Sequence, residues 1–193
     1  MENQSSVFDA PTSANVTVMS KKRPREYLTD AEIERLMAAA RDNRHGHRDA
    51  TAILVAYRHA LRSSELVTLR WDDVDFTTSR LHVRRAKGGE TAVHPISGKE
   101  LRALRRLLRE SERSTCIFVS ERGAPLSVAG YQRMVARAGE AAGFPFLVHS
   151  HMLRHSCGYK LANDGHDTRA IHRRRLVNLT CDWGSSPIAR VRA

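Results

Sequence analysis

The sequence predicts an α+β fold that is mainly helical and carries one small antiparallel sheet. Apolar residues recur at intervals of three and four through most of the chain, which is typical of helices with one buried side. Between Val74 and Ile96 the period changes to two, which indicates strands. The chain has 193 residues, which is enough for one domain with a proper core.

The helices can be placed from their capping residues and their apolar faces. Thr29 and Glu32 have the spacing of a capping box, so the first helix should begin here. The second predicted helix, about Arg48–Ala60, is apolar through its middle and should be central to the core. In chain order, the remaining predicted helices are about Ser63–Trp71, Gly98–Ser111, Val128–Ala142 and the segment Val148–Tyr159.

Two alternating runs, Leu81–Arg85 and Thr91–Ile96, predict a β-hairpin, and a third strand can lie near Val74–Phe76. Two glycines between the runs permit a tight turn. Lys87 would then lie at the hairpin tip. A lysine there is more often a solvated surface residue than a catalyst, but it can also reach a bound phosphate backbone as a point charge.

The composition favours a polyanionic partner. Thirty-two Lys and Arg residues against 21 Asp and Glu give a formal net charge of +11, and aromatic residues make up 6% of the chain. Nucleic acid is the default candidate for such a partner. Residues 1–25 are predicted to be a flexible arm that ends in a basic run. The run of Lys21, Lys22, Arg23 and Arg25 is either a localisation signal or a contact to DNA phosphates.

No sequence feature points to a membrane, a secretory route or a metal. No apolar run reaches the roughly 20 residues of a membrane span, and the first residues lack the apolar core of a signal peptide. The three cysteines include no CxxC pair, so we expect reduced thiols in a cytoplasmic protein. His149, His151 and His155 are the alternative as metal ligands, but their spacing does not put all three on one helix face.

Two short segments carry candidate phosphate ligands. His151 and Arg154 are three positions apart, so the imidazole and the guanidinium share one face of the predicted helix. Such a pair can address one phosphate, although a solvated basic face is the commoner use of these residues. Arg62 lies in the joint between two predicted helices. Glu65, one turn on, can fix its guanidinium, and the alternative is an ordinary surface ion pair.

Taken together, these positions resemble the catalytic domain of tyrosine recombinases, the phage-integrase family, over about residues 27–171. Residues 60–66, Ala-Leu-Arg-Ser-Ser-Glu-Leu, are similar to the first arginine motif of that family, and Lys87 is similar to its β-hairpin lysine. His151–His155 matches the His-x-x-Arg box. The wording His-Met-Leu-Arg-His-Ser-Cys-Gly, with Leu-Ala-Asn at 161–163, is most similar to small recombinases that invert fimbrial promoter segments.

The resemblance implies a tyrosine-recombinase catalytic-domain fold over residues 26–171. It also implies site-specific integration or inversion of double-stranded DNA through a 3′-phosphotyrosine intermediate. In this mechanism Arg62 and Arg154 stabilise charge on the non-bridging oxygens, and Glu65 supports Arg62. Lys87 protonates the leaving 5′ oxygen, and His151 manages the proton of the attacking group. No metal or other cofactor is implied. The implied partners are DNA and an oligomer on DNA, formed with itself or with a full-length recombinase.

The sequence departs from the family pattern beyond the His-x-x-Arg box. The family places a Leu-Gly-His signature and a tyrosine nucleophile there, but no tyrosine follows Tyr159 in this sequence. Tyr159 is five residues after Arg154, about 140° around a helix axis, so it should point away from the phosphate and pack. Residues 172–193 are predicted to be an aberrant, disordered tail. We hypothesise that a reading-frame change or a truncating rearrangement replaced the native C-terminus.

Two function hypotheses follow from these residues. The first is a recombinase-family DNA-binding protein that grips a phosphate but does not cut DNA alone, because no phosphotyrosine forms without the nucleophile. The second is a non-catalytic DNA-binding regulator of fimbrial-type gene expression, or a partner that interferes with an intact recombinase.

Overall fold

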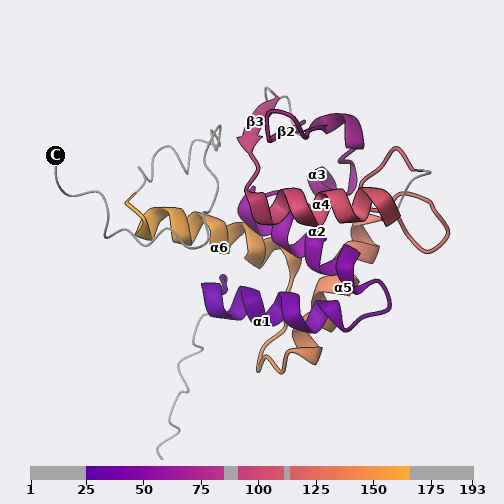
Figure 1. The fold of residues 1–193 in the computed structure, drawn as a ribbon. Helices are drawn as coiled ribbons and strands as arrows, with labels where there is room; N and C mark the ends of the chain where they lie inside the picture. Colours follow the sequence, from indigo (N-terminus) through magenta and orange to yellow (C-terminus); the bar gives the residue numbers. More distant parts are fainter. Residues whose placement is uncertain (1–24, 85–90, 111–113, 166–193) are drawn as a thin grey trace, which may run out of the picture.

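Six α-helices and a three-stranded sheet make up the part of the chain that the structure describes (Figure 1), which is residues 25–84, 91–110 and 114–165 of a computed structural model. The predicted α+β, mainly helical class is therefore confirmed. In chain order the elements are α1 (Asp30–Arg41), α2 (Gly46–Arg58), α3 (Ser63–Val67), a 3-10 turn (Trp71–Asp73), β1 (Val74–Asp75), β2 (Arg80–Val83), β3 (Ala92–Pro95), α4 (Gly98–Glu110), α5 (Val128–Ala141) and α6 (Ser150–Asn163).

Helix α2 is the centre of the core. It packs against α1, α3, α4 and α6, and Figure 1 shows it between α4 and α1. Every residue from Ala50 to Arg58 is buried, which explains the continuous apolar run in its sequence. The predicted central position of this helix is confirmed, although the helix begins and ends two residues earlier than the sequence indicated.

The start of α1 follows the predicted capping box. The Thr29 hydroxyl accepts the Glu32 N–H at 3.4 Å, and the Glu32 carboxylate accepts the Thr29 N–H at 2.8 Å. The helix then buries one face against α2 and α5. The residues on this face are Ile33, Leu36, Met37 and Ala40.

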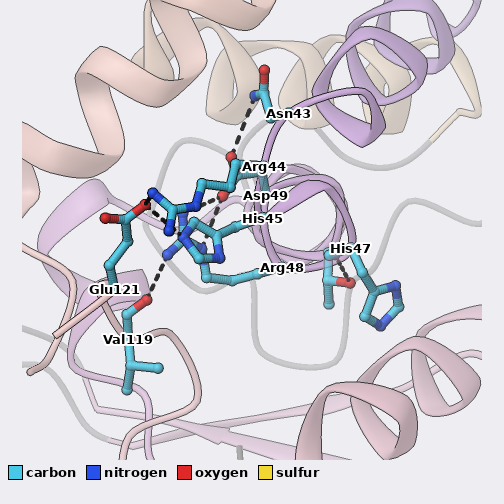
Figure 2. A network of polar contacts seen from close by, with 9 residues as sticks. Asn43, Arg44, His45, His47, Arg48, Asp49, Val119 and Glu121 are labelled. Carbon is cyan, nitrogen blue, oxygen red and sulfur yellow. Dashed lines mark hydrogen bonds and ion pairs between the residues drawn. The ribbon is translucent and has the colours of Figure 1, made fainter. Parts of the chain in front are cut away.

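A polar network fixes the N-terminal end of α2 to the loop before α5 (Figure 2). Arg48 donates to the Val119 carbonyl at 2.7 Å and pairs with the buried carboxylate of Asp49 at 2.6 Å. Glu121, on the same loop, pairs with Arg44 at 2.8 Å. This end of α2 is therefore fixed by side chains of opposite charge, whereas its other end leads into Arg62.

The sheet has the antiparallel order β1-β2-β3. Leu81 of β2 is opposite Val74 of β1 and His94 of β3. The predicted hairpin and third strand are thus present. The tip of the hairpin, with Lys87, lies outside the described residues.

Helix α3 is shorter than the sequence indicated, since it ends at Val67 rather than at Trp71. The chain leaves the helix because the next backbone groups bond elsewhere. Leu69 accepts the Ile117 N–H at 3.0 Å, and Trp71 donates to the Thr115 carbonyl at 3.0 Å. These bonds pair the segment with the loop that precedes α5.

The approach of α5 to the start of α6 depends on Gly139. A Cβ at this position would lie 2.7 Å from the Cβ of Val148, which is closer than real contacts allow. The close approach places the start of α6 beside α5. Along α6 the predicted apolar stripe of Leu153, Cys157 and Leu161 is fully buried. None of the described helices combines the length and the apolarity that crossing a membrane requires.

Candidate functional site

Arg62 lies in the joint between α2 and α3 and is held by Glu65. The guanidinium donates to the Glu65 carboxylate at 2.8 Å, and the Arg62 N–H donates to its other oxygen at 3.0 Å. The Glu65 side chain is 0% exposed, whereas the Arg62 side chain is 32% exposed. The contact is therefore not an ordinary surface ion pair. A buried carboxylate fixes one side of the guanidinium and leaves the rest of it open.

Arg154 reaches the same joint from α6. Its guanidinium donates to the carbonyl of Ala60, two residues before Arg62. Ala60 has a φ of 49°, a left-handed conformation that turns the chain after α2. A second link joins the same two segments, because the hydroxyls of Ser63 and Ser150 lie 2.8 Å apart. The side chain of Arg154 therefore reaches the turn that leads into Arg62, where α3 and α6 begin.

His151 lies in the first turn of α6 and shares this environment. Partial burial lowers its pKa first, and the positive charges of His155, Arg154, His149 and Arg62 lower it further. The ring stands edge-on to that of His155, with centroids 4.5 Å apart. With its pKa lowered, His151 is mainly a neutral imidazole near pH 7 and can accept or donate a proton.

The charges at this joint favour an anion. Arg62 and Arg154 bring positive charge to it, the N-terminal end of α6 adds positive potential, and Glu65 is already engaged by Arg62. Within the described residues, no group of three or more His, Cys, Asp or Glu side chains is arranged to hold a metal.

Five predicted site residues remain, and only one of them, Arg25, lies in the described part of the chain. Lys87, Lys21, Lys22 and Arg23 lie outside the described residues. Arg25 is described, and it bonds to Glu32 of α1 at 3.0 Å and lies over the ring of Tyr27 at 5.2 Å. Its predicted role in DNA binding stays a prediction.

Each tyrosine of the chain is engaged or buried. Tyr159 is 44% exposed and stacks on Tyr27, with ring centroids 3.9 Å apart. The hydrogen bond between their hydroxyls raises the pKa of Tyr27 and lowers that of Tyr159. Tyr57 is buried and donates to Asp30 at 2.7 Å. Tyr131 is also buried, and burial raises its pKa. Tyr159 thus packs as expected, but on a surface ring rather than in the core.

The sequence did not reveal two sets of polar contacts at this site. The Ser63–Ser150 link was missed because a serine at the start of a helix is explained equally well as a cap. A buried cluster of Arg58, His59 and Glu100 was also missed. Its signal was a pair of charged residues at the end of an otherwise apolar helix.

We predict that the ring protons of His151 titrate below the usual histidine pKa of about 6.5 in NMR spectra of the free protein. Replacing Arg62 by Gln removes one of the positive charges that lower this pKa, so the midpoint should move upward. Arg44→Gln, at the opposite end of α2, is the control and should leave it unchanged. A His151 midpoint at or above the usual value in the unmodified protein would contradict this electrostatic description.

Three comparisons agree on the family. The model of the Phage integrase family matches residues 26–174. The type 1 fimbriae regulatory protein FimE of Escherichia coli (strain K12) is 42% identical over 159 residues, which cover 79% of this chain and 79% of that protein. FimB from the same strain is 38% identical over 154 residues, 77% of each protein. Tyrosine recombinase XerC of Pseudomonas fluorescens is 33% identical over 78% of this chain and 51% of its own length.

The solved structures give the same result for the fold. XerA recombinase is 28% identical with a TM-score of 0.68, over 76% of this chain and 54% of that one. The lambda integrase dimer bound to a core site has a TM-score of 0.64 at 23% identity, over 79% of this chain and 58% of that one. The chain thus spans about half the length of XerC and of XerA. The expected catalytic-domain fold is confirmed, and the chain belongs to the phage integrase family of tyrosine recombinases, on the fimbrial side represented by FimE and FimB.

Proposed function

We propose that this protein binds double-stranded DNA at a specific site and holds one backbone phosphate between Arg62, Arg154 and His151. The observation that carries the proposal is the hydrogen bond from Arg154 to the Ala60 carbonyl, two residues before Arg62, together with the lowering of the His151 pKa by the charges of both arginines. The solved structures of similar fold support the DNA partner, because they include lambda integrase bound to a core site and XerH bound to its difH substrate.

The chemistry of the three side chains fits a phosphodiester. Guanidiniums bind the non-bridging oxygens, where negative charge grows as phosphorus becomes five-coordinate. A neutral imidazole can take the proton of an attacking hydroxyl or return one. Lys87, from the β2–β3 hairpin, is proposed to protonate the leaving 5′ oxygen. The run of Lys21, Lys22, Arg23 and Arg25 is proposed to contact flanking phosphates.

The proposal includes assembly on DNA, since lambda integrase, which has a similar fold, forms a tetramer bound to a Holliday junction. It places the protein in the cytoplasm. Tyr27 and Tyr159 stack on each other, Tyr57 bonds to Asp30, and Tyr131 is buried. We therefore propose that none of these four tyrosines attacks the phosphate, and that strand exchange uses a nucleophile from an intact recombinase.

A scan of neutral phosphate replacements tests the phosphate grip. The duplex is selected from random-sequence DNA on this protein, and each backbone phosphate is replaced in turn by a methylphosphonate. One replacement near the centre of the site should weaken binding far more than the others. Each charge-assisted hydrogen bond is worth roughly 1.5–3 kcal/mol, so the loss should be about 10- to 100-fold.

In Arg62→Ala and in Arg154→Ala, this particular replacement should weaken binding less than in the unmodified protein, because one of the two guanidiniums that sense the charge is gone. Arg44→Ala is the control, since Arg44 is separated from Arg62 by the length of α2, roughly 20 Å. It should keep the full effect of the replacement. If both arginine variants retained the sensitivity of the unmodified protein, the proposed phosphate site would be wrong.

The alternative function, a regulator that occupies DNA without chemistry, is favoured by the engagement of all four tyrosines. A suicide duplex that traps phosphotyrosine tests the lack of DNA cleavage that both functions assume. We expect no covalent adduct from this chain alone, whereas a cleavage-competent recombinase on its own site provides the positive control. An adduct that disappears in the Phe variant of Tyr27, Tyr57, Tyr131 or Tyr159 would establish cleavage and contradict the proposal that none of them attacks the phosphate.

A further inference from the structure

A buried ionic cluster includes Arg58 and His59, the two residues that come just before the Ala60–Arg62 joint. Glu100, in the first turn of α4, is 0% exposed. Its carboxylate lies 3.0 Å from Nε of Arg58 and 2.9 Å from Nε2 of His59. Both partners are themselves buried at the C-terminal end of α2. The cluster therefore joins the start of α4 to the end of α2.

Two further contacts extend this cluster. The Glu100 carboxylate also accepts the Ser97 N–H at 2.9 Å and the Ser97 hydroxyl at 2.7 Å. The ring of His59 stands edge-on to that of His94 on β3, with centroids 5.3 Å apart. The end of α2 is thus held against both α4 and the sheet that carries the hairpin.

The carboxylate of Glu100 is ionised although it is buried. Burial acts to raise its pKa, but the charge and hydrogen bond of His59, the charge of Arg58 and the Ser97 N–H outweigh it, so the pKa is lowered. Buried ion pairs are weak contributors to net stability, since apolar side chains of the same volume often serve as well. A buried charged cluster at this point is better explained by orientation than by stability.

The cluster orients residues 58–60, and α6 packs against the same residues. Cys157 of α6 contacts the Arg58 carbonyl at 3.7 Å, and Arg154 of α6 donates to the Ala60 carbonyl. Both carbonyls belong to the turn that begins with Arg58 and His59. If these two side chains shifted, the carbonyl that holds Arg154 and the backbone of Arg62 would shift with them.

We propose that Glu100 is a positioning residue. By holding Arg58 and His59, it fixes the turn whose Ala60 carbonyl orients Arg154 and whose next residues place Arg62. Only the expected effect of Glu100 on DNA binding rests on the proposed function. The structural part, the ordering of the two guanidiniums by Glu100, can be measured without DNA.

The experiment compares Glu100→Gln with Leu104→Ala in the full chain. Leu104 is 2% exposed and lies one turn further along the same face of α4, so its loss loosens α4 without removing a partner of Glu100. Guanidinium signals of Arg154 and Arg62 are followed by nitrogen-15 NMR, at a temperature where thermal melts show every variant folded. In Glu100→Gln the NMR signal of the Arg154 guanidinium should no longer show slow rotation. In Leu104→Ala the signal should still show it.

A second readout uses the methylphosphonate duplex. The preference of the protein for the charged phosphate should fall about tenfold in Glu100→Gln, the equivalent of one lost charge-assisted hydrogen bond, and should persist in Leu104→Ala. If Glu100→Gln does not fold, His59→Leu and His59→Gln replace it. The Leu variant removes the donor to Glu100 and should free Arg154, whereas the Gln variant retains an N–H donor and should restore its order.

Equal effects of Glu100→Gln and Leu104→Ala on the Arg154 signal, or no effect of either, would overturn the positioning role. If the unmodified protein showed no preference for the charged phosphate, the proposed function would fail instead. The NMR comparison would still decide the role of Glu100, so the two failures are distinguishable.

Discussion

The hydrogen bond from Arg154 to the Ala60 carbonyl is the interaction on which the arrangement of the site depends. It joins α6 to the turn after α2, and Arg62 follows in that turn. The left-handed backbone of Ala60 costs roughly 1–2 kcal/mol for a residue with a Cβ, so the surrounding contacts must hold it. Those contacts are Leu61 N–H to the Ala56 carbonyl at 3.0 Å and the Arg62–Glu65 pair. The turn, rather than either arginine alone, sets the geometry of the site.

The two ends of α2 are held by different contacts, and only the C-terminal end leads into the site. At the N-terminal end, Arg48 and Glu121 fasten a loop to the helix, and no predicted site residue takes part in these bonds (Figure 2). At the C-terminal end, Glu100 fastens Arg58 and His59 just before the turn. Between them the helix is apolar and fully buried, which makes it a rigid support. A rigid support suits a site whose action depends on fixed positive charges, because such charges stabilise an oxyanion without first reorganising.

Much of the fold follows from local sequence. The capping box of α1, the apolar run of α2 and the change of period at Val74 each specify an element through neighbouring residues. The end of α3 does not, because Leu69 and Trp71 bond to a loop more than forty residues away. The same distinction holds at the site. Glu65 could be paired with Arg62 from spacing, whereas Glu100 meets His59 through tertiary packing that no local pattern records.

The central claim is that Arg62 and Arg154 close on one phosphorus, and a structure of this protein bound to its selected duplex tests it most directly. The account predicts that both guanidiniums lie within about 3 Å of oxygens of a single backbone phosphate, with His151 beside it. Guanidiniums bound to two different phosphates, or an Arg62 turned away from the DNA, would contradict it.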